Sequence, residues 1–67
     1  MDDYIKQAIK MLIIYIENKI IELNNNIKQQ DDGFLGTKRG YMWKQIRERK
    51  ITKYTNLEKI FEEMIDE

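Results

Sequence analysis

The chain of 67 residues contains no cysteine, no histidine and no proline. Their absence excludes disulfide bonds, thiolate and imidazole metal sites, and the usual nucleophile–histidine triads. The longest apolar run, MLIIYI at residues 11–16, is far shorter than the roughly 20 residues that cross a bilayer, and its context does not fit a signal peptide. We therefore expect a soluble protein of the cytoplasm, with no contact to a membrane.

Glycine is also scarce, and its three occurrences fall within one eight-residue window, at Gly33, Gly36 and Gly40. In a chain without proline this window is the only strong signal for a break. The sequence Asp31-Asp32-Gly33 is typical of a turn of the length that joins two packed helices. We predict a single helical domain over residues 1–67, with a helix over about 2–30, a turn over 31–36 and a helix over 37–65.

The first predicted helix has a wide apolar face. On a helical wheel one continuous stripe is formed by Ile5, Ala8, Ile9, Leu12, Ile16, Ile20, Leu23 and Ile27. A second row lies beside it and contains Tyr4, Ala8, Met11 and Tyr15. Asp2 and Asp3 are suited to cap the helix and to oppose its dipole. One antiparallel neighbour covers less than this face, so we expect a homodimer that forms a four-helix bundle.

The second predicted helix has an apolar stripe with a gap near its middle. The stripe consists of Leu35, Met42, Trp43, Ile46, Tyr54, Leu57, Ile60, Phe61 and Met64. Within the gap, Lys50 and Lys53 occupy the inward positions and Ile51 points elsewhere. Thr55 and Glu58 have the spacing of a capping box, which would begin a new helix. We expect the helix to continue through this region, and a break between residues 50 and 55 remains the alternative.

If the second helix is continuous, the fold class is all-α, with two long antiparallel helices in a helical hairpin. A turn centred on residues 31–36 would then place Ile16 level with Lys50 and Ile51. Glu17 would lie near Lys50 and offer it an ionic partner. Trp43 would face the other helix beside Ile46.

The net charge is zero, yet the charges are unevenly distributed. Residues 38–53 carry seven basic side chains against one acidic one, whereas residues 54–67 carry one basic side chain against five acidic ones. A solvated helix face is the simpler interpretation of this basic segment, and an anionic surface on a partner is the functional one. The candidate residues for binding a protein or a nucleic acid are Lys38, Arg39, Tyr41, Lys44, Arg47 and Arg49.

The size and pattern of the whole chain resemble those of the Rop-like plasmid copy-control hairpins and of short phage-encoded helical hairpins. The resemblance implies a regulator or inhibitor that works by binding a macromolecule. We expect a protein as the most suitable partner. Rop-like hairpins bind RNA, so RNA binding remains an alternative.

Residues 35–64, LGTKRGYMWKQIRERKITKYTNLEKIFEEM, also resemble the second half of Cro and lambda-repressor-type helix-turn-helix domains. The resemblance implies that Gly36 and Thr37 form the turn and helix start, and that Met42 and Ile46 are buried. The residues it would direct to DNA are Lys38, Arg39, Tyr41 and Lys44. In this alternative Trp43 would be exposed, and the protein would be a transcriptional regulator.

We find no residues suited to catalysis, and we expect no enzyme activity, cofactor or small-molecule substrate. Catalysis requires a water-limited pocket with groups of tuned pKa. The acidic pairs Asp31–Asp32 and Glu62–Glu63 could offer oxygen ligands to a divalent cation. Adjacent acids on a turn or a helix end are usually just solvated, so we predict no metal site.

Overall fold

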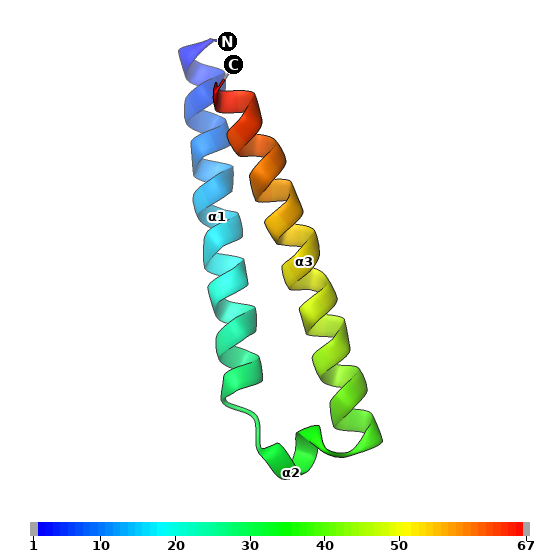
Figure 1. Cartoon of the computed structure of the whole chain (residues 1–67). Coiled ribbons are helices and arrows are strands. Elements are labelled where there is room, and N and C mark those ends of the chain that lie inside the picture. Colours follow the sequence, from blue (N-terminus) through cyan, green and yellow to red (C-terminus); the bar gives the residue numbers. More distant parts are fainter. Residues whose placement is uncertain (1, 67) are drawn as a thin grey trace.

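The computed structural model describes residues 2–66 and shows an all-helical chain with three helices. They are α1 (Asp3–Lys28), α2 (Asp32–Leu35) and α3 (Lys38–Asp66). Together they hold 91% of the residues, which confirms the all-α class and the two long helices. Figure 1 shows α1 and α3 running antiparallel, with α2 at the bend and both chain ends at the opposite end. The short helix α2 lies within the predicted turn and was not expected.

Short polar side chains cap the start of each helix. The Asp2 carboxylate accepts a hydrogen bond from the Tyr4 backbone N–H at 2.9 Å, and the Asp31 carboxylate accepts one from Gly33 at 3.2 Å. At the start of α3 the Thr37 hydroxyl accepts a hydrogen bond from the Gly40 N–H at 3.0 Å. Each such cap stabilises a helix by about 1 kcal/mol.

The bend is held by direct contact between α2 and the first turn of α3. Gly40 is buried, and a Cβ atom at this position would collide with the carbonyl oxygen of Phe34. Glycine therefore allows the backbones of the two helices to touch. One turn further, the rings of Phe34 and Trp43 meet edge to face with centroids 6.1 Å apart. Trp43 is half-buried at the bend, where it contacts α2, whereas Ile46, which was expected to lie inward beside it, is exposed.

Helix α3 is continuous, so the alternative of a break between residues 50 and 55 is wrong. The Thr52 hydroxyl donates to the carbonyl oxygen of Glu48 at 3.1 Å, and the Thr55 hydroxyl donates to that of Ile51 at 2.8 Å. These bonds run back along the helix, as they do for threonine in a helix interior. Thr55 is therefore not a helix cap, and its spacing to Glu58 occurs by chance.

The contact between α1 and α3 follows a heptad pattern that differs from the predicted stripes. Ile9 and Ile16 are buried, with 6% and 4% of their surfaces exposed. Half-buried residues continue this pattern at alternating intervals of three and four. On α1 they are Ile13, Ile20, Leu23 and Ile27, and on α3 they are Ile51, Tyr54, Glu58, Phe61 and Ile65. Two helices that wrap around one another follow a period near 3.5 residues rather than 3.6. The predicted stripes are therefore correct in part: on α1 the buried and half-buried residues include the expected Ile9, Ile16, Ile20, Leu23 and Ile27, and on α3 the expected Tyr54, Leu57 and Phe61 are half-buried.

Several predicted core residues are consequently exposed. Ile51 faces α1, whereas Lys50 and Lys53 are exposed, so the predicted interruption by inward lysines is wrong. The residues that were expected in the core and are exposed instead are Ile5, Ala8, Leu12, Met42, Ile46, Ile60 and Met64. A single partner helix covers only a narrow stripe, which leaves the rest of each apolar face open to solvent.

The register of the hairpin also differs from the prediction. Glu17 lies beside Glu58 and Glu62 rather than beside Lys50. The shift from Lys50 to Glu58 is eight residues, or about two helical turns. It arises because α3 begins against α2, so the first turns of α3 extend past the end of α1.

Candidate functional site

The predicted binding residues occupy the first half of α3, and the structure divides them into two groups. Lys38, Arg39, Tyr41 and Arg49 are exposed, and Tyr41 has 59% of its surface accessible. Lys44 and Arg47 are half-buried. The four exposed residues are available to a partner, whereas Lys44 and Arg47 contact other residues of α3.

Arg47 packs on Trp43, the residue that contacts Phe34 at the bend. Its guanidinium lies 3.8 Å above the centre of the Trp43 ring, and one of its N–H groups donates to the Trp43 carbonyl oxygen at 3.3 Å. Stacking of arginine on tryptophan contributes about 0.5–1 kcal/mol at partly exposed sites. We therefore assign Arg47 a structural role, because its charged group is already engaged.

Lys44 has an acidic partner one turn along α3. Its Nζ lies 3.7 Å from the Glu48 carboxylate, and both side chains are partly exposed. An ion pair of this type contributes only about 0.3–0.5 kcal/mol and breaks easily. Glu48 is the one acidic residue within residues 38–53, so it reduces the positive charge on this side of α3.

A shallow hollow adjoins the exposed group. It is lined by Tyr41, Met42, Gln45, Ile46 and Arg49, which all belong to α3. A hollow formed by a single helix is open to water and has no acid–base pair in its lining. It offers a partner an aromatic ring, two apolar side chains and one positive charge.

The start of α3 concentrates positive charge. Lys38 and Arg39 occupy its first turn, which contains no acidic residue. Basic residues at this position add to the positive end of the helix dipole and slightly destabilise the helix. The arrangement increases the attraction of this end of the hairpin for anionic groups.

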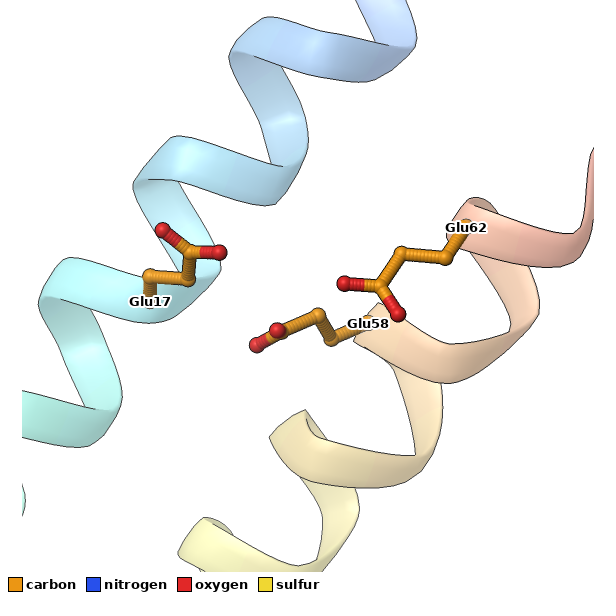
Figure 2. A group of neighbouring side chains, drawn as sticks. All are labelled: Glu17, Glu58 and Glu62. Carbon is orange, nitrogen blue, oxygen red and sulfur yellow. The ribbon is translucent and has the colours of Figure 1, made fainter. Parts of the chain in front are cut away.

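A cluster of three glutamates lies between the two long helices, nearer the chain ends than the bend. Figure 2 shows Glu17 of α1 and Glu58 and Glu62 of α3 pointing toward one another, and one carboxylate oxygen of each lies within 4.8 Å of the others. Partial burial raises the pKa of Glu58. The charges of Glu17 and Glu62 and a hydrogen bond to Glu62 raise this pKa further.

Carboxylate oxygens suit hard cations, so these three residues are the group within residues 2–66 that could hold a metal ion. The sequence prediction missed this cluster. The spacing of Glu58 and Glu62 places both on one face of α3, and the expected register kept Glu17 away from them.

Large apolar side chains remain exposed on both long helices. On α3 they are Tyr41, Met42, Ile46, Ile60 and Met64, and on α1 they are Tyr4, Ile5, Met11, Leu12, Ile14, Tyr15 and Ile21. The α1 residues include the predicted second row, which α3 does not cover.

Comparison of the chain with known protein families, curated proteins and solved structures found no match. None of the helices within residues 2–66 has the length and apolar character of a membrane span.

Proposed function

We propose that this protein is a non-enzymatic helical hairpin that binds an acidic surface of a protein partner through the first half of α3. The observation that carries the proposal is the exposed group of Lys38, Arg39, Tyr41 and Arg49 in a chain of zero net charge. Such a hairpin acts as a regulator or inhibitor by occupying a surface of its target, in the manner of small phage-encoded proteins. Positive charge steers the approach, and Tyr41 supplies contact area.

The shape of the chain supports a binding role. The hairpin is a rod of 50 × 15 × 12 Å, and the hollow next to the basic residues is formed by one helix. A catalytic site needs groups held in place around a substrate and shielded from water. A surface on a long helix supplies neither, but it presents side chains at regular intervals to a flat or grooved partner.

Self-association into a four-helix bundle belongs to the same proposal. The chain has 67 residues, and its buried apolar residues are Ile9 and Ile16 within residues 2–66. A domain of this size has a marginal core. Pairing of two hairpins would cover the apolar residues that remain exposed on α1 and α3.

Charge favours a protein over a nucleic acid as the partner. Binding to phosphate backbones relies on a strong excess of positive charge, and this chain is neutral with an acidic half of α3. The helix-turn-helix resemblance implies a second helix start after the recognition helix, whereas α3 runs unbroken from Lys38 to Asp66. DNA binding and Rop-like RNA binding remain alternatives that the same experiment tests.

The test compares two variants with equal changes of charge. Lys38→Glu with Arg39→Glu alters the candidate surface, and Lys10→Glu with Lys59→Glu alters exposed lysines elsewhere on the hairpin. A partner is captured on the tagged protein from cells that encode it, identified, purified and titrated against each variant. We expect affinity to fall at least tenfold for the first variant, about 1.4 kcal/mol, and less than threefold for the control.

Nucleic acids are tested in parallel. The protein is mixed at low salt with duplex DNA from its own upstream region and with an RNA hairpin, and complexes are detected by gel shift. If Lys38→Glu with Arg39→Glu abolishes such a shift, the partner of this surface is a nucleic acid and not a protein. Equal losses of partner affinity in both charge variants would contradict the assignment of the surface.

A further inference from the structure

We infer that a second copy of this chain packs antiparallel against the exposed stripe of α3, with Met42 and Ile46 of each copy against Met64 and Ile60 of the other. The inference rests on the self-association included in the proposed function, and adds to it the face, the direction and the contact residues. It follows from the placement of the exposed apolar residues, the exposed area of the hairpin and the distribution of charge along α3.

The four residues form a straight stripe on α3. At about 100° per residue, Met42, Ile46, Ile60 and Met64 fall within roughly 40° of one another on the wheel. Their exposed fractions are 57%, 51%, 52% and 38%. The stripe points away from α1, because the residues that contact α1, such as Ile51 and Phe61, lie on another side of the helix.

The stripe is complementary to itself when reversed. The interval between Met42 and Ile46 equals the interval between Ile60 and Met64, so a two-fold axis near Lys53 places one pair against the other. An interface that uses the same patch on both copies is the usual form of a homodimer. The two Lys53 side chains then meet near the axis, where their long stems carry the ammonium groups to the edge.

The exposed area of the hairpin matches what such an interface buries. The accessible surface is 5492 Å², whereas a compact protein of this mass exposes about 4,500 Å². The difference of about 1,000 Å² is close to the area of roughly 800 Å² that each partner contributes to a standard interface. A second copy supplies this cover without requiring any other molecule.

The α1 residues extend the same apolar surface. The acidic cluster of Glu17 and Glu62 occupies one edge of the contact between α1 and α3. In the heptad pattern Ile5 and Leu12 lie on the opposite edge, next to Leu57 and the stripe on α3. The second copy therefore meets a face made by both helices rather than a single ridge.

Charge selects the antiparallel direction. The basic half of α3, residues 38–53, lies beside residues 54–66 of the other copy, which carry Lys59 against Glu58, Glu62, Glu63 and Asp66. In a parallel dimer the two basic halves would lie side by side at a helix spacing of about 8–10 Å, within the screening length of about 10 Å at 0.1 M salt. The antiparallel dimer also places Lys38 and Arg39 of the two copies at opposite ends of the rod, where it can engage two partners.

Cysteine cross-linking tests the face and the direction together, because the chain has no cysteine of its own. Met42→Cys and Met64→Cys are made as separate variants and treated with a short bifunctional maleimide, alone and as an equal mixture. We expect the mixture to give a cross-linked dimer and each variant alone to give little. Thr52→Cys, which is exposed on another side of α3, is the control and should give none in mixtures. Cross-linking of Met42→Cys with itself would show a parallel dimer and overturn the inference.

Two further variants keep the test independent of misfolding. Lys53→Met replaces the charge at the axis by an apolar side chain, so the dissociation constant of the dimer should fall at least fivefold. Ile60→Lys should increase the dissociation constant about tenfold or more, while circular dichroism confirms that both variants remain helical. Sedimentation equilibrium measures both constants.

The outcomes separate the two proposals. A monomer at all accessible concentrations, or a dimer unaffected by both substitutions, would overturn the inference, even if the Lys38→Glu, Arg39→Glu variant still loses its partner. A dimer that cross-links as expected, with partner binding unaffected by the charge reversal, would support the inference and reject the basic surface as the binding site.

Discussion

At the scale of single residues, Glu58 is placed where its charge is unfavourable. It is half-buried on α3, and the carboxylates of Glu17 and Glu62 lie close by. No basic side chain is among the causes of its pKa shift, which all raise the pKa above the ordinary value of 4.5. Ionisation of Glu58 therefore destabilises the folded hairpin.

The substitution Glu58→Gln should stabilise the protein at neutral pH. The folded state holds the Glu58 proton more tightly than the unfolded chain, so the free energy of unfolding falls as pH rises from 4.5 through the raised pKa. At pH 7 we expect Glu58→Gln to increase this free energy by about 0.5 kcal/mol, the magnitude of exposed like-charge contacts. The gain should shrink near pH 4, where the Glu58 carboxyl is protonated.

Urea unfolding followed by circular dichroism measures this effect at both pH values. Glu63→Gln is the matched control, because Glu63 is an exposed glutamate of the same helix outside the cluster. An equal gain for both variants would indicate a general effect of the acidic half of α3. A loss of stability in Glu58→Gln would show that the glutamate makes a favourable contact that outweighs the repulsion.

At the scale of the helices, two threonines with similar sequence signals have opposite roles. Thr37 precedes α3, and its hydroxyl accepts a hydrogen bond from the Gly40 N–H while donating one to the Phe34 carbonyl oxygen at 2.6 Å. Thr55 lies within α3 and bonds back to Ile51. The first connects two helices, and the second makes no contribution as a cap.

Alanine substitution should separate the two roles. Thr37→Ala removes a cap and is expected to lower the free energy of unfolding by about 1 kcal/mol or more. Thr55→Ala removes a hydroxyl from a helix interior, where alanine has the higher helix propensity, so stability should stay within about 0.5 kcal/mol or rise. Unfolding at one fixed chain concentration gives both values. A larger loss for Thr55→Ala would restore a helix start at that position.

Local signals predicted the helices well, and the contact between them poorly. The expected helix over residues 2–30 and the observed α1 differ by two residues or fewer at each end, because Asp2 and the glycine window act on the neighbouring backbone. The four-residue helix α2 was missed, since so short a segment has no periodicity. The core contact was predicted in part: Ile9 and Ile16 are buried as expected, whereas Ile5 and Leu12 are exposed, because the heptad period depends on the presence of the other helix.

The candidate site residues were also predictable only in part. Exposure of Lys38, Arg39, Tyr41 and Arg49 follows from their position on a solvated helix face. Arg47 lies one helical turn after Trp43 on α3, so the spacing in the sequence already allowed their contact, although it was not predicted. The cluster of Glu17 with Glu58 and Glu62 connects two helices and depends on the register, which a single sequence does not define.

At the scale of the whole molecule, the hairpin has too little core for its length. Within residues 2–66 the buried apolar side chains are Ile9 and Ile16, while large apolar residues are exposed on both long helices. Burial of apolar surface is the main favourable term in folding, and in the dimer inferred above most of this burial comes from association. Folding and dimerisation should therefore occur in one step.

Coupled folding makes thermal stability depend on chain concentration. If two unfolded chains form one folded dimer, a hundredfold rise in concentration should raise the melting temperature by roughly 10 °C, given an unfolding entropy of about 2 cal/mol/K per residue. Circular dichroism at 222 nm, in cuvettes of different path length, measures the change in melting temperature between about 5 and 500 μM chain. Ile60→Lys should lower the melting temperature most at the low concentration, where the weakened dimer is already dissociating. A melting temperature that stays constant across this range would mean that the two helices hold together as a monomer, with another molecule required to cover the stripe on α3.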